Sequence, residues 1–257
     1  MSIKNILIIL IILPLLSTCN IHKIQPNIER EMMIFEQNLN EIFEGEHKFQ
    51  NYSYGKFSTI EIYNEKYDTA ILYLHGRGLN PNEQNLAYPI RTKMSDTFNT
   101  YSIQLPVLKK DSTYYEYEKI FYDSDARIES AIDNILNNNK KIIIIAHSCG
   151  VHMLMSYINN NELSSSVKSL ILIGSGAVDR GQRLINPYPY DKISVPILDI
   201  YGENDFKLVL KKSKERLELI KEISKKSKQV EIKLSNHYHV DNSDELIDKV
   251  KKWLSSQ

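Results

Sequence analysis

The sequence Lys-Ile-Ile-Ile-Ile-Ala-His-Ser-Cys-Gly, at residues 141–150, decides the fold. Four consecutive isoleucines with no polar residue between them predict a strand that is buried on both faces of a parallel sheet. Beyond this stretch, apolar residues recur at helical spacing, at Val151, Leu154, Met155 and Ile158. The region therefore predicts a buried strand, a tight turn and a helix that returns along the sheet.

Similar units lie on both sides of this stretch. Short apolar runs predict further strands at residues 69–74, 100–105, 169–173, 195–201 and 230–234. Apolar residues at spacings of three and four predict helices at residues 28–43, 86–94, 128–136, 207–228 and 243–254, the last capped by Ser243. This alternation is typical of the α/β class, with a mostly parallel sheet covered by helices on both faces. Ligands of such sheets bind at the carboxyl ends of the strands, so the residues after each strand are candidates for function.

The turn after the strand at residues 141–146 places Ser148 between a strand and a helix, as in a nucleophile elbow. Such a turn strains the central residue and needs small residues two positions before and two positions after it. Ala146 and Gly150 meet this need, with Ala146 in place of the usual glycine. We expect Ser148 to be a nucleophile. The alternatives are a serine that only caps the helix, or Cys149 as the nucleophile, although an elbow exposes its central residue.

A glycine-rich turn, His75-Gly76-Arg77-Gly78, follows the strand at residues 69–74. Glycines allow backbone N–H groups to face a developing oxyanion, and a loop at this place supplies one such donor beside a nucleophile elbow. The candidate donors are the backbone N–H groups of Arg77 and Cys149. We interpret His75 as structural, and the Arg77 side chain either contacts an anionic substrate or is solvated.

A candidate acid and a candidate base follow the last two strands. Asp205 ends the sequence Gly-Glu-Asn-Asp at residues 202–205, where an acid can orient an imidazole; Glu203 is a weaker rival, and Asp205 could instead cap a helix. The sequence Asn-His-Tyr-His at residues 236–239 offers His237 as the general base and His239 as the second choice. The order Ser148, Asp205, His237 is that of the serine–acid–histidine triads on a nucleophile elbow.

These motifs together resemble those of the α/β-hydrolase superfamily, and more narrowly an uncharacterised family of exported bacterial proteins with that fold. The resemblance rests on residues 74–78, 102–108, 126–132, 144–154 and 236–254, and it covers roughly residues 50–254. It implies a serine hydrolase that forms an acyl-enzyme without a cofactor and acts on a small-molecule or lipid ester. Ala146 and the N-terminal segment depart from the family pattern.

Two other functions compete with this one. His237-Tyr238-His239-Val240-Asp241 reads as His-x-His-x-Asp, which resembles part of a zinc-ligand motif of metal-dependent hydrolases. Asn242 stands where that motif continues with another histidine, and we therefore expect no metal site. The second competitor is a non-catalytic exported binding protein on the same fold, because a fold alone does not prove an activity.

The N-terminus is typical of a bacterial export signal. Lys4 precedes an apolar run of 11 residues, 6–16, which is too short to span a bilayer and is followed by Cys19. We expect residues 1–18 to be a signal peptide, Cys19 to be lipidated, residues 19–27 to form a tether and residues 28–257 to form a single domain. The protein would then be anchored to a membrane facing the periplasm or the cell exterior. The alternative is a cleaved signal with an incidental cysteine.

The charge composition argues against one class of partner. The chain has 32 basic and 32 acidic residues, and the basic ones form no stripe. Binding to nucleic acid normally needs a concentrated basic surface, so we expect no nucleic-acid partner.

Overall fold

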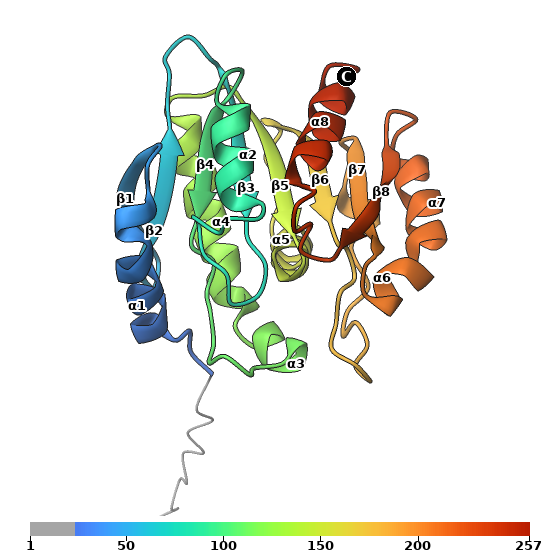
Figure 1. Ribbon diagram of the computed structural model, residues 1–257, viewed down its shortest axis with the longest axis horizontal. Coiled ribbons are helices and arrows are strands. Elements are labelled where there is room, and N and C mark those ends of the chain that lie inside the picture. The colour runs from blue at the N-terminus through green and yellow to red at the C-terminus, as the bar shows by residue number, and fades with distance from the viewer. Residues whose placement is uncertain (1–23) are drawn as a thin grey trace, which may run out of the picture.

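Residues 24–257 are described by a computed structural model, which contains an eight-stranded sheet with helices on both faces (Figure 1). The strands are β1 (Glu46–Tyr52), β2 (Gly55–Ile62), β3 (Thr69–Leu74), β4 (Asn99–Ile103), β5 (Lys141–His147), β6 (Val167–Ile173), β7 (Ile197–Asn204) and β8 (Lys228–Asn236). The helices are α1 (Ile28–Asn38), α2 (Ala87–Met94), α3 (Tyr114–Glu118), α4 (Phe121–Leu136), α5 (Cys149–Asn160), α6 (Lys207–Lys211), α7 (Ser213–Ile223) and α8 (Ser243–Leu254), with short 3-10 turns η1 (Leu39–Glu41) and η2 (Tyr190–Lys192). Within residues 24–257, none of the helices combines the length and apolar character needed to cross a membrane.

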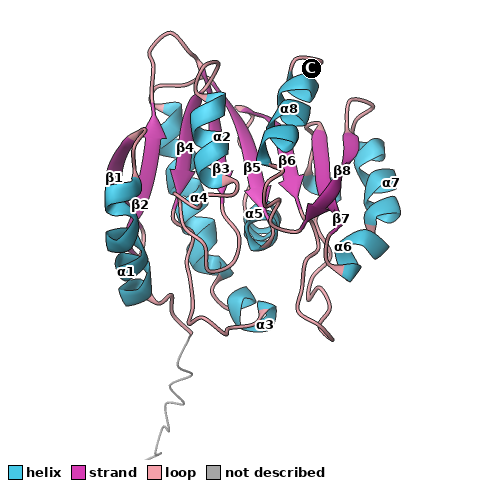
Figure 2. Cartoon of the chain, viewed as in Figure 1, coloured by secondary structure: helices cyan, strands magenta, loops and turns pink. Residues whose placement is uncertain are grey.

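The sheet is mostly parallel, as the sequence predicts. Its strand order is β1-β2-β4-β3-β5-β6-β7-β8, and every pair from β4 to β8 is parallel. Only β2 runs opposite to the other strands: it forms an antiparallel hairpin with β1 and also pairs antiparallel with β4, at one edge of the sheet (Figure 2). The pattern of apolar residues does not predict this hairpin.

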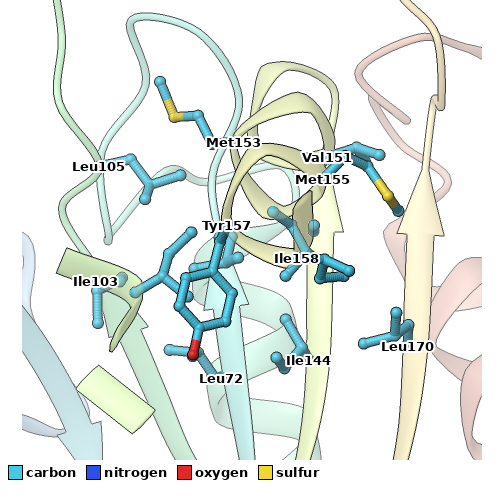
Figure 3. Packing of buried hydrophobic residues seen from close by; sticks show 14 of the residues in the cluster. Leu72, Ile103, Leu105, Ile144, Val151, Met153, Met155, Tyr157, Ile158 and Leu170 are labelled. Atoms are coloured by element: carbon cyan, nitrogen blue, oxygen red, sulfur yellow. The ribbon is translucent and has the colours of Figure 1, made fainter. Parts of the chain in front are cut away.

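The four isoleucines of β5 explain why the strand is apolar throughout. Successive side chains of a strand point to opposite faces, so Ile142 and Ile144 join one core while Ile143 and Ile145 join the other. Helices α4 and α5 pack on the first face, and α2 and α8 on the second. Figure 3 shows side chains of α5 lying over the strands on the first face. Each such isoleucine contributes about 2 kcal/mol by burial, so the strand that carries the elbow is firmly held.

A buried ion cluster attaches α1 to the core. The Arg127 guanidinium on α4 binds the carboxylates of Glu31 on α1 at 2.9 Å and of Asp123 at 2.7 Å. Burial raises the pKa of Glu31, against the opposing effect of Arg127. Removing one partner of a buried pair typically costs about 3–5 kcal/mol, because the other charge is left uncompensated. Helix α1 is therefore an integral part of the folded chain.

The segment at residues 207–228 differs from its prediction as one long helix. It contains α6 and α7, separated at Lys212, and then the start of β8. The Arg216 side chain donates to the carbonyl of Val209 at 2.7 Å, and the Ser213 hydroxyl donates to the carbonyl of Leu210 at 2.8 Å. A continuous helix would need these carbonyls for its own backbone. At the last helix, Asn242 rather than Ser243 occupies the N-cap position, and Ser243 is the first helical residue.

Asp125 lies buried between α4 and α5, the helix that follows the elbow. One carboxylate oxygen accepts hydrogen bonds from Ser156 at 3.1 Å and Asn160 at 2.8 Å. The other oxygen has no hydrogen-bond partner among the described residues. Burial raises the pKa of Asp125 to about 6. The folded chain therefore holds this proton in a pH range where the unfolded chain has already released it.

This raised pKa predicts a pH-dependent effect of Asp125→Asn on stability. Asp125 contributes up to about 3 kcal/mol to the free energy of unfolding. This contribution is fully present below about pH 4 and is lost as the pH rises through about 6. Asparagine does not titrate, so the variant should gain about 2–3 kcal/mol relative to the unsubstituted protein between pH 4 and pH 7. Urea unfolding at both pH values measures this gain. A difference between the two proteins that is the same at both pH values would contradict it.

Candidate active site

The strand order places the site. The chain runs from β3 to β4 in one direction and from β5 through β8 in the other, so the order reverses between β3 and β5. These strands pair in parallel, with Leu74 opposite Ala146, and the loops that follow them therefore meet. A side chain at Gly150 would have its Cβ 2.5 Å from the Leu74 carbonyl oxygen, so only glycine fits there. Such a reversal is where α/β sheets form a ligand crevice.

Ser148 has the backbone of a strained turn. Its φ is 54° and its ψ is −117°, a conformation that costs a non-glycine residue about 1–3 kcal/mol. The Ser148 N–H donates to the Ile173 carbonyl at 2.8 Å, which ties the turn to β6. Ala146 is fully buried directly before the turn, so its methyl group fits where glycine is usual. The strand, the turn and the helix together hold the Ser148 side chain at the crevice.

Ser148, His237 and Asp205 form a hydrogen-bonded chain. The Ser148 Oγ lies 2.8 Å from Nε2 of His237, and Nδ1 of His237 lies 2.6 Å from Oδ1 of Asp205. His237 and Asp205 are buried, and Ser148 is partly exposed. With its Nδ1–H donated to the carboxylate, the imidazole has Nε2 free to accept the serine proton. The three residues expected from the sequence are therefore brought together.

The environment of Asp205 keeps its carboxyl group ionised. Burial alone would raise the pKa of Asp205, but the hydrogen bond and charge of His237 oppose this effect. The backbone N–H groups of Phe206 at 2.7 Å and Gly202 at 3.3 Å also donate to the carboxylate. The pKa of Asp205 is lowered as a result, so a carboxylate faces the imidazole at neutral pH.

Three further neighbours, which the sequence did not predict, confine His237. The Phe206 ring stacks on it with 4.1 Å between centroids, and the His147 ring donates from Nε2 to the His237 carbonyl at 2.9 Å. Gly174 has a φ of 66°, and a Cβ there would lie 2.6 Å from Cε1 of His237. The ring is thus confined on several sides.

The loop after β3 lies against the elbow. A Cβ on Gly76 would be 3.3 Å from Cβ of Ser148. Arg77 and Cys149 line the same cavity as Ser148, and within residues 24–257 their backbone N–H groups have no hydrogen-bond acceptor. Two uncommitted donors next to a nucleophile are what an oxyanion hole requires.

The Arg77 side chain is paired, which differs from both uses considered from the sequence. Its two terminal nitrogens donate to the two carboxylate oxygens of Asp179 at 2.6 and 2.8 Å. The hydrogen bonds from Arg77 lower the pKa of Asp179, and the Tyr114 N–H adds a further donor at 2.7 Å. The pair joins the loop after β3 to the loop after β6.

A cavity of about 760 Å³ opens over Ser148. Residues 109–123 and residues 176–191 both contribute to its walls. They are tied together where Tyr114 Oη accepts the Ile185 N–H at 3.3 Å and Tyr115 Oη accepts the Arg183 N–H at 3.1 Å. Figure 1 shows α3 and α6 at this end of the sheet. Representative wall residues are Leu79, Tyr114, His152, Val178, Phe206 and Leu208.

The other candidate side chains lie in different surroundings. His239 is buried with its Nδ1 2.8 Å from the Ser235 hydroxyl, and burial lowers its pKa to about 4. Burial raises the pKa of the Cys149 thiol to about 12, which removes the thiolate needed for attack. His75 accepts the Leu105 N–H at 3.0 Å, so it braces the loop after β3. His237 rather than His239 therefore contacts Ser148.

The His-x-His-x-Asp stretch does not converge on one point. His237 is hydrogen-bonded to Asp205 and Ser148, His239 lies against Ser235, and Asp241 is exposed. In the part of the chain that is described, no three histidine, cysteine or acidic side chains are grouped as metal ligands. Cys19, the candidate lipidation site, lies outside the described residues.

Comparison with solved structures identifies the architecture. The chain is similar to the Pyrococcus furiosus esterase Pf2001 (TM-score 0.64, 16% identity, 85% of this chain and 93% of that one). It is also similar to Est1E from Butyrivibrio proteoclasticus (0.62, 14%, 83% and 98%) and to the Bacillus subtilis carboxylesterase CesB (0.61, 12%, 89% and 99%). No model of a protein family matches the sequence, and the curated protein sequences contain no significant match. The similarity to the three solved structures shows that the chain has the α/β-hydrolase fold.

Proposed function

We propose that this protein is a serine hydrolase that cleaves carboxylic esters through an acyl-enzyme intermediate. The observation that carries the proposal is the hydrogen-bonded chain from the strained Ser148 through His237 to Asp205, at 2.8 and 2.6 Å. These are the distances at which a base can take the proton of a nucleophile while an acid orients the base. The esterases among the structures of this fold give further support at the level of architecture.

The first half of the reaction forms a bond from Ser148 to the substrate. Nε2 of His237 takes the hydroxyl proton as Ser148 Oγ attacks the carbonyl carbon. The carboxylate of Asp205 stabilises the imidazolium that results, and the negative charge moves to the carbonyl oxygen. The tetrahedral intermediate collapses when His237 donates its proton to the leaving alkoxide. The products of this half are an acyl-Ser148 and a free alcohol.

The second half releases the acid. His237 removes a proton from a water molecule, which attacks the acyl carbon, and the proton then returns to Ser148 as its oxygen leaves. The backbone N–H groups of Arg77 and Cys149 are the donors we assign to the oxyanion in both halves. One donor of this kind contributes about 3 kcal/mol to the stability of the transition state. No cofactor takes part in these steps.

Pre-steady-state hydrolysis of p-nitrophenyl acetate and butyrate tests this proposal. We expect a rapid release of nitrophenol equal to the enzyme concentration, followed by slower turnover, because the acyl-enzyme accumulates with an activated ester. A binding protein of the same fold would release none. Activity that disappears with a chelator and returns with zinc would support the metal-dependent alternative instead.

Gly174→Ala is expected to lower kcat/KM for such esters by at least about 100-fold, because its Cβ would push the imidazole away from Ser148. Gly176→Ala is the matched control. Gly176 also has a positive φ, 85°, but a Cβ there meets nothing within 4 Å. Both variants carry a backbone cost of about 1–2 kcal/mol, so only the first should lose activity per folded molecule. Equal losses in the two variants would contradict the role assigned to this contact.

We further propose that the protein is exported and held at a membrane by a lipidated Cys19, facing the periplasm or the cell exterior. The support is the sequence pattern of residues 1–19. An anchored enzyme of this kind would have access both to membrane lipids and to soluble esters outside the cytoplasm. Labelling cells with an alkyne fatty acid tests the anchor: incorporation should be lost in Cys19→Ser, and incorporation that persists in this variant would exclude Cys19.

A further inference from the structure

The cavity over Ser148 is rich in unpaired positive charge. Four cations line it, Arg77, Arg180, Lys207 and Lys211, against one carboxylate, Asp179. Asp179 is already bound to Arg77, and the remaining three cations have no ion-pair partner within residues 24–257. With neutral histidines the lining therefore has a formal charge of 4 − 1 = +3. The whole chain has a formal charge of zero, so this excess is local.

The two lysines stand on a helix that is held in place beside Asp205. They stand at the first and last positions of α6, four residues apart, and therefore share one side of the helix. Val209 between them is fully buried, and the Arg216 side chain donates to its carbonyl at 2.7 Å. Arg216 is in turn bound to Asp199 at 3.0 Å. These contacts fix the rotation of α6, which directs the lysines to the cavity.

Arg180 lines the same cavity from a segment separate from α6. It belongs to the loop after β6, one residue beyond the Asp179 carboxylate that Arg77 holds. That bidentate pair fixes the loop next to Arg180. Apolar side chains, among them Leu79 and Leu208, line the same cavity. The space is thus apolar in part and bordered by free cations from two separate segments.

We propose that the substrate carries an anionic group, a carboxylate or a phosphate, on a part of the molecule that is not attacked. The unpaired cations Arg180, Lys207 and Lys211 would bind that group while Ser148 attacks the ester carbonyl. This inference rests on the proposed esterase function. A cavity lined by charge of one sign concentrates ligands of the opposite sign, and Lys and Arg are the usual partners of carboxylate and phosphate.

Two pairs of esters test the inference and show which part of the substrate carries the anion. The first pair is mono-p-nitrophenyl glutarate and its methyl ester, in which the end of the acyl group is a charged carboxylate or a neutral ester of similar size. The second pair is 4-carboxyphenyl acetate and its methyl ester, which differ in a charge on the leaving group. In at least one pair we expect kcat/KM to favour the anion by about tenfold or more at low salt. The preference should weaken at 0.5 M salt, where exposed charges are screened.

The double variant Lys207→Glu/Lys211→Glu should lower kcat/KM for the preferred anionic ester by about tenfold or more and leave its neutral partner within about twofold. Lys207→Arg/Lys211→Arg should keep the preference. Lys214→Glu, a single charge reversal on the exposed part of α7 outside the cavity, is a control for position and should change kcat/KM for neither ester. For each ester, the kcat/KM of the variant is divided by that of the unsubstituted enzyme, so that differences in intrinsic reactivity between the esters cancel.

The outcomes separate the two proposals. If the unsubstituted enzyme hydrolyses none of the four esters, the esterase function fails. If it hydrolyses the neutral and anionic members equally, or if the glutamate variant keeps the preference, the esterase function stands and the anionic substrate class is wrong.

Discussion

Replacing Ser148 with alanine is expected to lower kcat/KM for p-nitrophenyl butyrate by at least about four orders of magnitude. The reason is that, among the lining residues that the structure describes, no other nucleophile is hydrogen-bonded to a base: the Cys149 thiol is buried, and burial raises its pKa to about 12. Alanine removes one oxygen from a partly exposed side chain, so the fold should be unchanged. Rates are measured with enzyme concentrations high enough to detect the residual reaction.

Ser175→Ala is the matched control for this experiment. Ser175 is buried near the end of β6, and its hydroxyl has no hydrogen-bond partner among the described residues. We expect this variant to keep its activity within a few-fold, and both variants to melt within a few degrees of the unsubstituted protein. Activity in Ser148→Ala that approaches that of the control would show that another residue forms the acyl-enzyme.

Replacing His237 with glutamine is the second prediction with a large effect, a loss of about four orders of magnitude or more in kcat/KM. Glutamine can still donate a hydrogen bond to the buried Asp205, so the carboxylate keeps a partner. It cannot take the proton of Ser148, so the nucleophile loses its base. The same ester assay measures this loss.

His239→Asn is the comparison that decides between the two histidines. His239 has a φ of 49°, which asparagine tolerates better than most residues. Its ring lies against Ser235 and not against Ser148. We expect His239→Asn to retain activity per folded molecule within about tenfold, with any loss arising from stability. If His239→Asn fails to hydrolyse the ester and His237→Gln still hydrolyses it, the assignment of the base is reversed.

The central strands could be predicted from the sequence because both of their faces are buried. In β3, β5 and β6 nearly every position is apolar, so the strands appear as continuous runs. The edge hairpin of β1 and β2 gives no such signal, because β1 is largely exposed and has charged or polar residues on both faces. Its turn at Ser53 and Tyr54 also lacks the Asn-Gly or Asp-Gly pair that marks many hairpins.

The split between α6 and α7 could not be predicted for a different reason. The apolar spacing through residues 207–223 is compatible with one helix, and propensity alone favours continuity. The break depends on Arg216, whose side chain is oriented by Asp199 on β7 and takes the Val209 carbonyl. Such a tertiary contact has no local sequence pattern.

The candidate triad could be located from the sequence because each of its members follows a strand, and the ends of parallel strands meet at one edge. The contacts that confine it are long-range. The Arg77–Asp179 pair joins residues 102 positions apart, and Gly174 is required by the nearby His237 ring as well as by its own positive φ. The choice between His237 and His239, which the sequence left open, depends on how the chain folds after β8. Phe206 adds a stacking contact that only the fold reveals.

The most direct test of the central claim is to treat the protein with a fluorophosphonate and identify the modified residue by peptide mass spectrometry. Such a reagent forms a stable bond with a serine that a neighbouring base activates. We predict one adduct per chain, on Ser148, lost when His237 is replaced by glutamine. Two results would contradict the assignment of Ser148 and His237 as nucleophile and base. One is an adduct on another residue, and the other is a treated protein that hydrolyses esters at full rate but has not formed an adduct.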